Sequence, residues 1–94
     1  MIRIIAALLI AGTWCAPLAQ ADTGEHIYLS LIHQNYFADE HTDSQWLAEA
    51  HKICNAHLSG TTDDQLMAMV AADLNVPDDD SRVVTGDAVG ALGC

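Results

Sequence analysis

Two histidines flank a cysteine at three-residue spacing in the middle of the chain, and these residue types could bind a metal ion. The stretch is HKICNAHLSG, which contains His51, Cys54 and His57. Imidazole nitrogens and cysteine thiolates are common zinc ligands. On a helix, however, His51 and His57 would lie about 120° apart around the axis and about 9 Å apart along it. Two histidines that share one ion on a helix are usually three or four residues apart. The spacing therefore predicts no metal site.

The start of the chain has the pattern of an export signal. Arg3 provides a positive charge, residues 4–11 are apolar, and Pro17 interrupts the segment. Ala19-Gln20-Ala21 then matches the small residues that signal peptidase recognises. A membrane-spanning helix needs about 20 apolar residues, and this stretch is interrupted too early to serve as one. We therefore predict a cleaved signal peptide over residues 1–21.

Cleavage at this position leaves residues 22–94 as a single small domain. A lipid-modified Cys15 is the less favoured alternative, because that processing requires a small residue before the cysteine and Trp14 is large. The expected product is secreted, in the extracellular space or the cell envelope, without stable insertion in a membrane. Its oligomeric state is not predicted.

Export decides how the cysteines are interpreted. Removal of Cys15 with the signal peptide leaves Cys54 and Cys94 in an oxidising compartment, where paired thiols form disulfides. The bond would close a long loop and would constrain the unfolded chain by about 4 kcal/mol. Such a contribution is comparable to the whole stability of a small domain. We therefore predict a Cys54–Cys94 disulfide.

The charge composition excludes one class of partner. The chain has 13 acidic residues and three basic ones, with a formal net charge of −10. Only Lys52 and Arg82 remain as basic residues after the predicted cleavage. Because phosphate groups are bound mainly through lysine and arginine, we predict no nucleic-acid partner. The expected partner is a protein or a small molecule of unknown identity.

Helical periodicity runs through the whole predicted domain, and no strand-like alternation of useful length occurs. Two Thr-x-x-Gln sequences, starting at Thr42 and Thr62, match capping boxes at helix starts. Asp78-Asp79-Asp80 fits the start of a further helix better than a calcium loop. The fold class is therefore predicted as all-α, a small four-helix bundle joined by one disulfide. The expected helices are 24–37, 44–58, 63–74 and 81–92.

The faces of these expected helices separate the candidate binding residues from the core. His26, His33 and Phe37 fall on the side of the first helix opposite its apolar stripe. His57 falls on the apolar stripe of the second helix, which makes it a candidate buried, pH-sensitive group. In the last helix, Gly86 and Gly90 are small enough to allow a close approach to the second.

The run from Tyr28 to Cys94 resembles a known family. An aromatic and apolar first helix precedes Cys54, which is followed by Gly60, and a capped leucine-rich third helix precedes Cys94 at the end of the fourth. These features resemble the small secreted, mostly mycobacterial domains of unknown function numbered family 732. The resemblance implies a secreted helical domain and assigns it no activity.

The residues favour binding over catalysis. No serine lies in a nucleophile elbow, and both cysteines of the predicted domain are committed to the bridge. We therefore expect a non-enzymatic interaction or binding module, with no cofactor. The alternative is a small-molecule carrier that binds haem or a divalent metal through the surface histidines His26 and His33 beside Phe37. A third possibility is a pH response, in which acid destabilises the fold by charging a buried His57.

Overall fold

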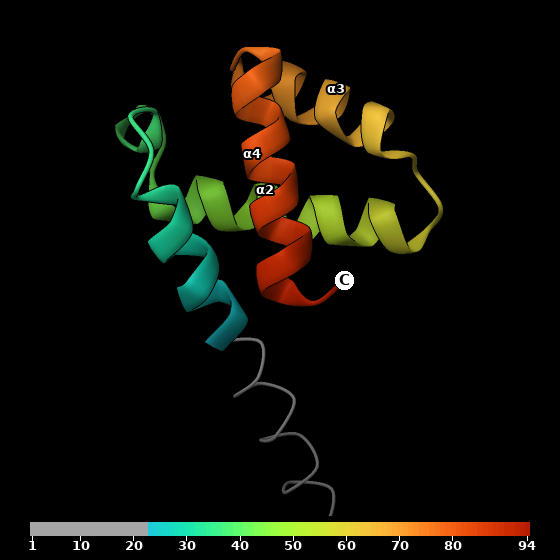
Figure 1. Cartoon of the computed structure of the whole chain (residues 1–94), viewed down its shortest axis with the longest axis horizontal. Helices are drawn as coiled ribbons and strands as arrows, with labels where there is room; N and C mark the ends of the chain where they lie inside the picture. The colour runs from blue at the N-terminus through green and yellow to red at the C-terminus, as the bar shows by residue number, and fades with distance from the viewer. Residues whose placement is uncertain (1–22) are drawn as a thin grey trace, which may run out of the picture.

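The computed structural model describes residues 23–94, and the predicted signal peptide lies outside this range. Within it the chain is built from helices and contains no strand. A first helical segment covers 23–32. The remaining elements are η1 (Ala38–Glu40, a short 3-10 helix), α2 (Asp43–Leu58), α3 (Asp63–Leu74) and α4 (Asp78–Leu92) (Figure 1). The prediction of a small all-α bundle with one disulfide is confirmed.

Helices α2 and α3 begin at the two predicted capping boxes. Thr42 Oγ1 accepts a hydrogen bond from Gln45 N at 3.2 Å, and Gln45 Oε1 accepts one from Thr42 N at 2.8 Å. Thr62 and Gln65 make the same reciprocal pair, at 3.2 and 3.1 Å. Each box satisfies two backbone N–H groups that a helix start leaves unpaired. The local sequence therefore determines both helix starts.

Helix α4 begins at Asp78, three residues before the predicted start at position 81. Pro77 precedes it with φ −62°, and its carbonyl accepts the first helical hydrogen bond from Ser81 N at 2.9 Å. The three aspartates therefore occupy the first turn itself, where the helix dipole stabilises negative charge.

The first helix ends earlier than predicted, so the expectation of one helix over 24–37 is wrong at its C-terminal end. The side-chain amide of Asn35 donates to Leu31 O at 3.0 Å and to Ile32 O at 3.3 Å. Both carbonyls also accept hydrogen bonds from backbone N–H groups three residues on, in place of the four-residue bonds of a continuing helix. The chain turns after residue 32 instead, and the turn redirects Phe37 into the core, where it is only 1% exposed.

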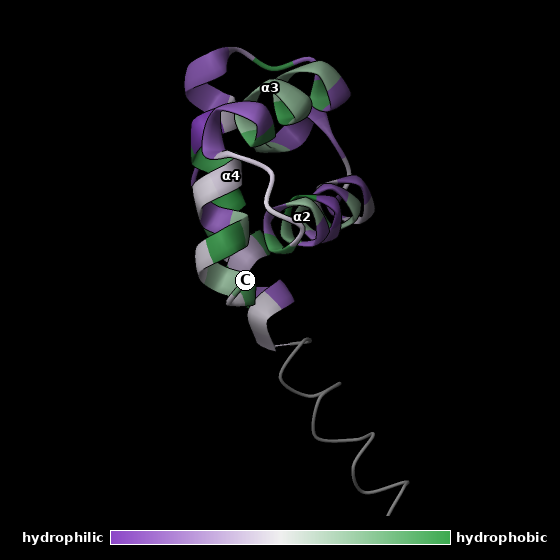
Figure 2. Ribbon diagram, turned by 90° about the vertical axis from the view of Figure 1, so that its right-hand side faces the viewer, coloured by the Kyte–Doolittle hydropathy of each residue, from purple (hydrophilic) through white to green (hydrophobic). Residues whose placement is uncertain are grey.

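The core is formed by side chains from every described helix. Tyr28 donates its hydroxyl proton to Trp46 O at 2.9 Å, and Trp46 Nε1 donates to Ala38 O at 2.9 Å. The polar ends of both aromatic residues are thus satisfied inside the protein. Helices α2, α3 and α4 each carry both hydrophobic and hydrophilic residues, as amphipathic helices do (Figure 2). The fully buried large side chains include Tyr28, Ile32, Trp46, Ile53, Leu66, Val70 and Val84.

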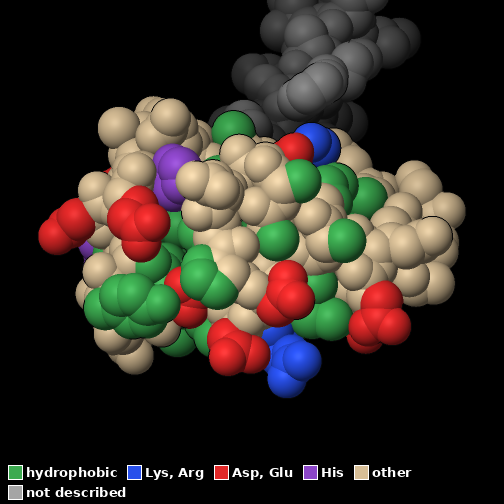
Figure 3. Space-filling model, turned by 90° about the horizontal axis from the view of Figure 1, so that it is seen from above, with side chains coloured by type: hydrophobic (Ala, Val, Ile, Leu, Met, Phe, Trp, Pro, Cys, Tyr) green, Lys and Arg blue, Asp and Glu red, His purple; other side chains and the backbone are tan. Residues whose placement is uncertain are grey.

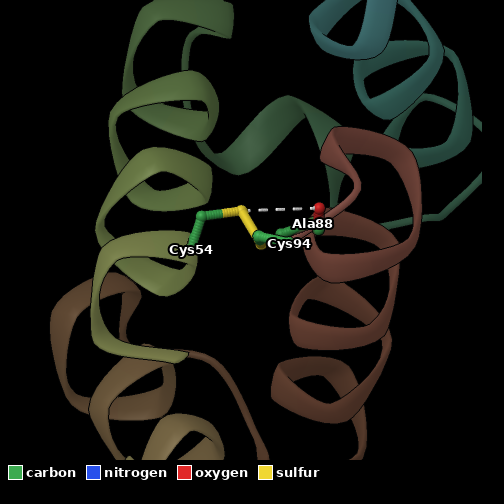
Figure 4. The surroundings of a disulfide bond; sticks show 3 residues. All are labelled: Cys54, Ala88 and Cys94. Carbon is green, nitrogen blue, oxygen red and sulfur yellow. Dashed lines mark hydrogen bonds between the residues drawn. A yellow bond between two sulfur atoms is a disulfide. The ribbon is translucent and has the colours of Figure 1, made fainter. Parts of the chain in front are cut away.

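Helix α4 crosses α2 and contacts both α2 and α3 (Figure 1). The predicted disulfide joins Cys54 in α2 to Cys94 just beyond the end of α4, with 5.5 Å between the two Cα atoms. The Cys54 sulfur also lies 3.9 Å from the carbonyl oxygen of Ala88 (Figure 4). The disulfide therefore holds the C-terminal end of α4 against α2.

The glycines of the fold differ in how much space lies around the position of an added Cβ atom. A Cβ added to Gly24 would lie 2.9 Å from Ala91 O, so the first helical segment approaches α4 too closely for a side chain. Gly86 and Gly90 are the opposite case, because both are exposed and an added Cβ would meet nothing within 4 Å. The expectation that these two glycines allow a close approach of α4 to α2 is therefore wrong. They lie on the outer face of α4.

Candidate functional site

The three residues of the His51–Cys54–His57 motif lie in separate environments. Cys54 is oxidised and has no thiolate to offer a metal. His51 Nε2 lies 2.9 Å from Glu25 Oε1, so this histidine links α2 to the first helical segment. Across residues 23–94, no three side chains of the types that bind metals are grouped so that they could hold an ion.

The place of His57 on the apolar stripe of α2 predicted a buried residue. In the structure His57 is half-buried. Its Nδ1 atom is shielded from solvent and has no hydrogen-bond partner within the described chain. A pH response through His57 stays a prediction.

The structure does not bring together the three residues of the predicted carrier site. His26 and His33 are exposed, and His33 Nε2 lies 2.9 Å from Asp43 Oδ1 at the start of α2. Phe37 is in the core, with its ring centroid 5.5 Å from that of Tyr36 and 5.7 Å from that of Trp46. The placement of Phe37 beside the surface histidines is therefore wrong, because it assumed a helix that continued to residue 37.

His41 has a structural role that the sequence did not indicate. Its Nε2 donates a hydrogen bond to Leu74 O at 2.8 Å, at the end of α3. Its ring also packs against the ring of Trp46 in a T-shaped arrangement, with 5.1 Å between the two ring centroids. Because it lies in a polar break between expected helices, no periodic pattern identified this contact.

Glu49 is an ionisable residue that lies almost completely buried in the fold. It is 6% exposed, and its Oε2 atom is buried without a hydrogen-bond partner among residues 23–94. It lies on the same face of α2 as Trp46 and Ile53, which are three and four residues away and are also buried. That spacing was available in the sequence as a sign of burial.

The environment of Glu49 favours its protonated form. Burial raises the pKa of Glu49 to about 7, and Asp73 on α3 adds to the shift through a hydrogen bond and its charge, opposed by Lys52. Lys52 Nζ donates to Asp73 Oδ2 at 2.6 Å, and this contact lowers the pKa of Asp73. Tyr28 also faces the site, and burial followed by the charge of Glu49 raises its pKa. The protonated form of Glu49 is thus favoured beside the Lys52–Asp73 pair, which joins α2 to α3.

A groove of about 610 Å³ lies between α3 and α4. We call it the α3–α4 groove. Its apolar floor is formed by Met67 from α3 together with Gly86, Val89 and Gly90 from α4. The two exposed glycines thus lie within the groove, and their missing side chains contribute to its depth.

Charged residues border the α3–α4 groove. Asp63 and Asp64 come from the first turn of α3, and Arg82 comes from α4. A second hollow of about 300 Å³ shares Asp64, Met67 and Arg82 with the first and extends to Asp78 at the start of α4. The two hollows therefore form one depression along α4. An apolar floor with charged borders is suited to non-covalent binding.

The surface around these elements is predominantly acidic. In the view from above, carboxylates are spread around patches of hydrophobic side chains (Figure 3). Among residues 23–94, no helix combines the length and the apolar composition needed to cross a bilayer.

Comparison of the chain with known protein families, curated proteins and solved structures found no match. The resemblance to family 732 is therefore carried only by the residues named for it above and stays a prediction. The α3–α4 groove was not visible in the sequence, because it depends on how two helices cross.

Proposed function

We propose that this protein is a secreted, non-enzymatic interaction module that binds a partner in the α3–α4 groove. The disulfide supports export, because such bonds form and persist mainly in oxidising compartments. A location in the cell envelope or the extracellular space, of mycobacterial type, follows the resemblance to family 732.

The single observation that supports binding is the α3–α4 groove itself. Its floor contains two glycines on an exposed helical face where alanine would be favoured by about 0.5–1 kcal/mol per residue. Neither glycine is required by a turn, a positive φ or a close contact within the described part of the chain. An occupant that approaches the backbone of α4 would give both glycines a role.

The same geometry makes the carrier alternative less well supported. Haem or a metal ion would need the surface histidines to converge with an apolar wall, and His33 is paired with Asp43 while Phe37 lies in the core. The groove lining includes no histidine.

The test compares what three forms of the oxidised protein retain from an extract of its own source. Gly86→Met fills the groove with a side chain that favours helix, whereas Val83→Met places the same side chain on α4 outside the groove. We expect quantitative mass spectrometry to show proteins retained by the wild type and by Val83→Met but depleted about tenfold on Gly86→Met. Equal retention on all three forms would rule out the groove as the binding site.

A further inference from the structure

We infer that the occupant of the α3–α4 groove is an amphipathic helix of a partner protein, with basic residues beside its apolar stripe. This inference rests on the proposed function and adds the chemical class of the partner. The shape of the groove, the exposed backbone of its floor and its border charges support it.

The length of the groove fits a helix. The two joined hollows extend along α4 from Asp78 to Gly90. At about 1.5 Å per residue these positions are about 18 Å apart, which matches about three turns of a second helix. An open depression of this length between two helices is the setting in which an amphipathic helix places its apolar stripe.

The floor of the groove allows such a helix to come close. Gly86 and Gly90 are one turn apart, and the space above each would accept a side chain without contact. Met67 from α3 and Val89 from α4 also line the groove. A methionine on a binding surface can adjust its conformation to different partner side chains. Large apolar residues of a partner could therefore fill the positions that the glycines leave empty.

The charges select a basic partner. Three aspartates, Asp63, Asp64 and Asp78, border the groove against one arginine, Arg82. The whole chain carries a formal net charge of −10. Opposite charge on the partner would accelerate its approach and fix its register, whereas a second copy of this chain would be repelled.

The experiment uses designed peptides as probes, titrated into the oxidised, isotopically labelled chain and followed by NMR. One peptide of about 14 residues has a leucine and alanine stripe flanked by lysine, and its matched partner has glutamate in place of lysine. We expect the lysine peptide to bind at least about tenfold more tightly in 0.1 M salt. The shifted amides should include those of Met67, Gly86 and Gly90.

Two pairs of variants test the site. Gly86→Met should weaken binding of the lysine peptide at least about tenfold, and Val83→Met should change it less than about twofold. Asp63→Asn with Asp64→Asn should weaken binding about two- to fivefold. Asp39→Asn with Glu40→Gln removes the same charge from η1, away from the groove, and should have a smaller effect. Circular dichroism checks that each variant keeps its helices.

Several outcomes would overturn the inference. Equal binding of the two peptides, tighter binding of the glutamate peptide, or binding unaffected by Gly86→Met would each do so. Self-association of the chain that Gly86→Met abolishes would identify a second copy as the occupant instead. If extract proteins depend on the groove but the lysine peptide does not bind, the interaction module stands and only the basic helix is excluded.

Discussion

Helix α2 is joined to α3 and to α4 by different chemistry. At its contact with α4 the Cys54–Cys94 bond lies beside the fully buried Ala88. Its contact with α3 includes the Lys52–Asp73 pair, and the buried Glu49 lies beside that pair with a raised pKa. The two contacts should therefore respond to different changes in the surroundings: the first to reduction and the second to pH. The mutations below test this separation, beginning with the largest effect.

Removal of the disulfide should have the largest effect. Cys54→Ser with Cys94→Ser frees a loop of 40 residues in sequence separation. The expected loss in the free energy of unfolding is about 4 kcal/mol, because the unfolded chain regains its entropy. Urea denaturation measures it, and the reduced wild type should show a similar loss. A double variant as stable as the oxidised protein would contradict the role given to this contact.

Glu49 should make the fold more stable in mild acid. Its pKa is raised from 4.5 to about 7 in the folded protein, so its contribution is complete below the unfolded value and is lost as pH rises through about 7. We expect a loss of about 1–3 kcal/mol between pH 5 and 8.5 in urea denaturation.

Two variants isolate this effect from that of other groups. Glu49→Gln keeps the shape and a hydrogen-bond donor for Asp73 but cannot ionise, so its stability should vary less over the same pH range. Glu40→Gln, at an exposed position, should keep the wild-type profile. A Glu49→Gln profile identical to the wild type would show that groups other than Glu49 determine the response.

Overfilling the contact with α4 should have an intermediate effect. Ala88→Leu adds three carbons at a fully buried position beside the disulfide. The expected cost is about 1–3 kcal/mol in the free energy of unfolding, with no dependence on pH. Val83→Leu, on a partly exposed position of the same helix, is the control and should change little. A pH-dependent cost at Ala88 would show that the two contacts are not separate.

Removal of the exposed ion pair should have the smallest effect on stability. Lys52→Met breaks the 2.6 Å contact with Asp73, but the ammonium group is well solvated. Chemical denaturation at pH 5 should hardly distinguish the variant from the wild type. Because Lys52 lowers the pKa of Glu49, the titration of Glu49 followed by NMR should move to higher pH. A shift to lower pH would contradict the arrangement of charges.

The helix boundaries could be predicted wherever a local signal determines them. The capping boxes at Thr42 and Thr62 placed the starts of α2 and α3 to within one residue. The end of the first helix was missed because Asn35 competes for its last carbonyls, which hydrophobic periodicity does not register. That one turn decided whether Phe37 faced solvent or the core.

The sequence predicted less of the candidate sites than of the fold. The disulfide followed from counting cysteines, and Glu49 could have been found from its place on the apolar face of α2. The α3–α4 groove could not, because Met67 and Gly86 are brought together only by the packing of two helices. Glycines on a helix indicate close packing or open space equally well until the neighbouring atoms are known.

The close approach of Gly24 to Ala91 brings the two ends of the described chain together. A short flexible linker could therefore join residue 94 to residue 23, and new ends could be opened near the exposed Gly60 between α2 and α3. Such a circular permutant should fold to the same bundle. A label or surface tether attached at the new ends would leave both original ends undisturbed.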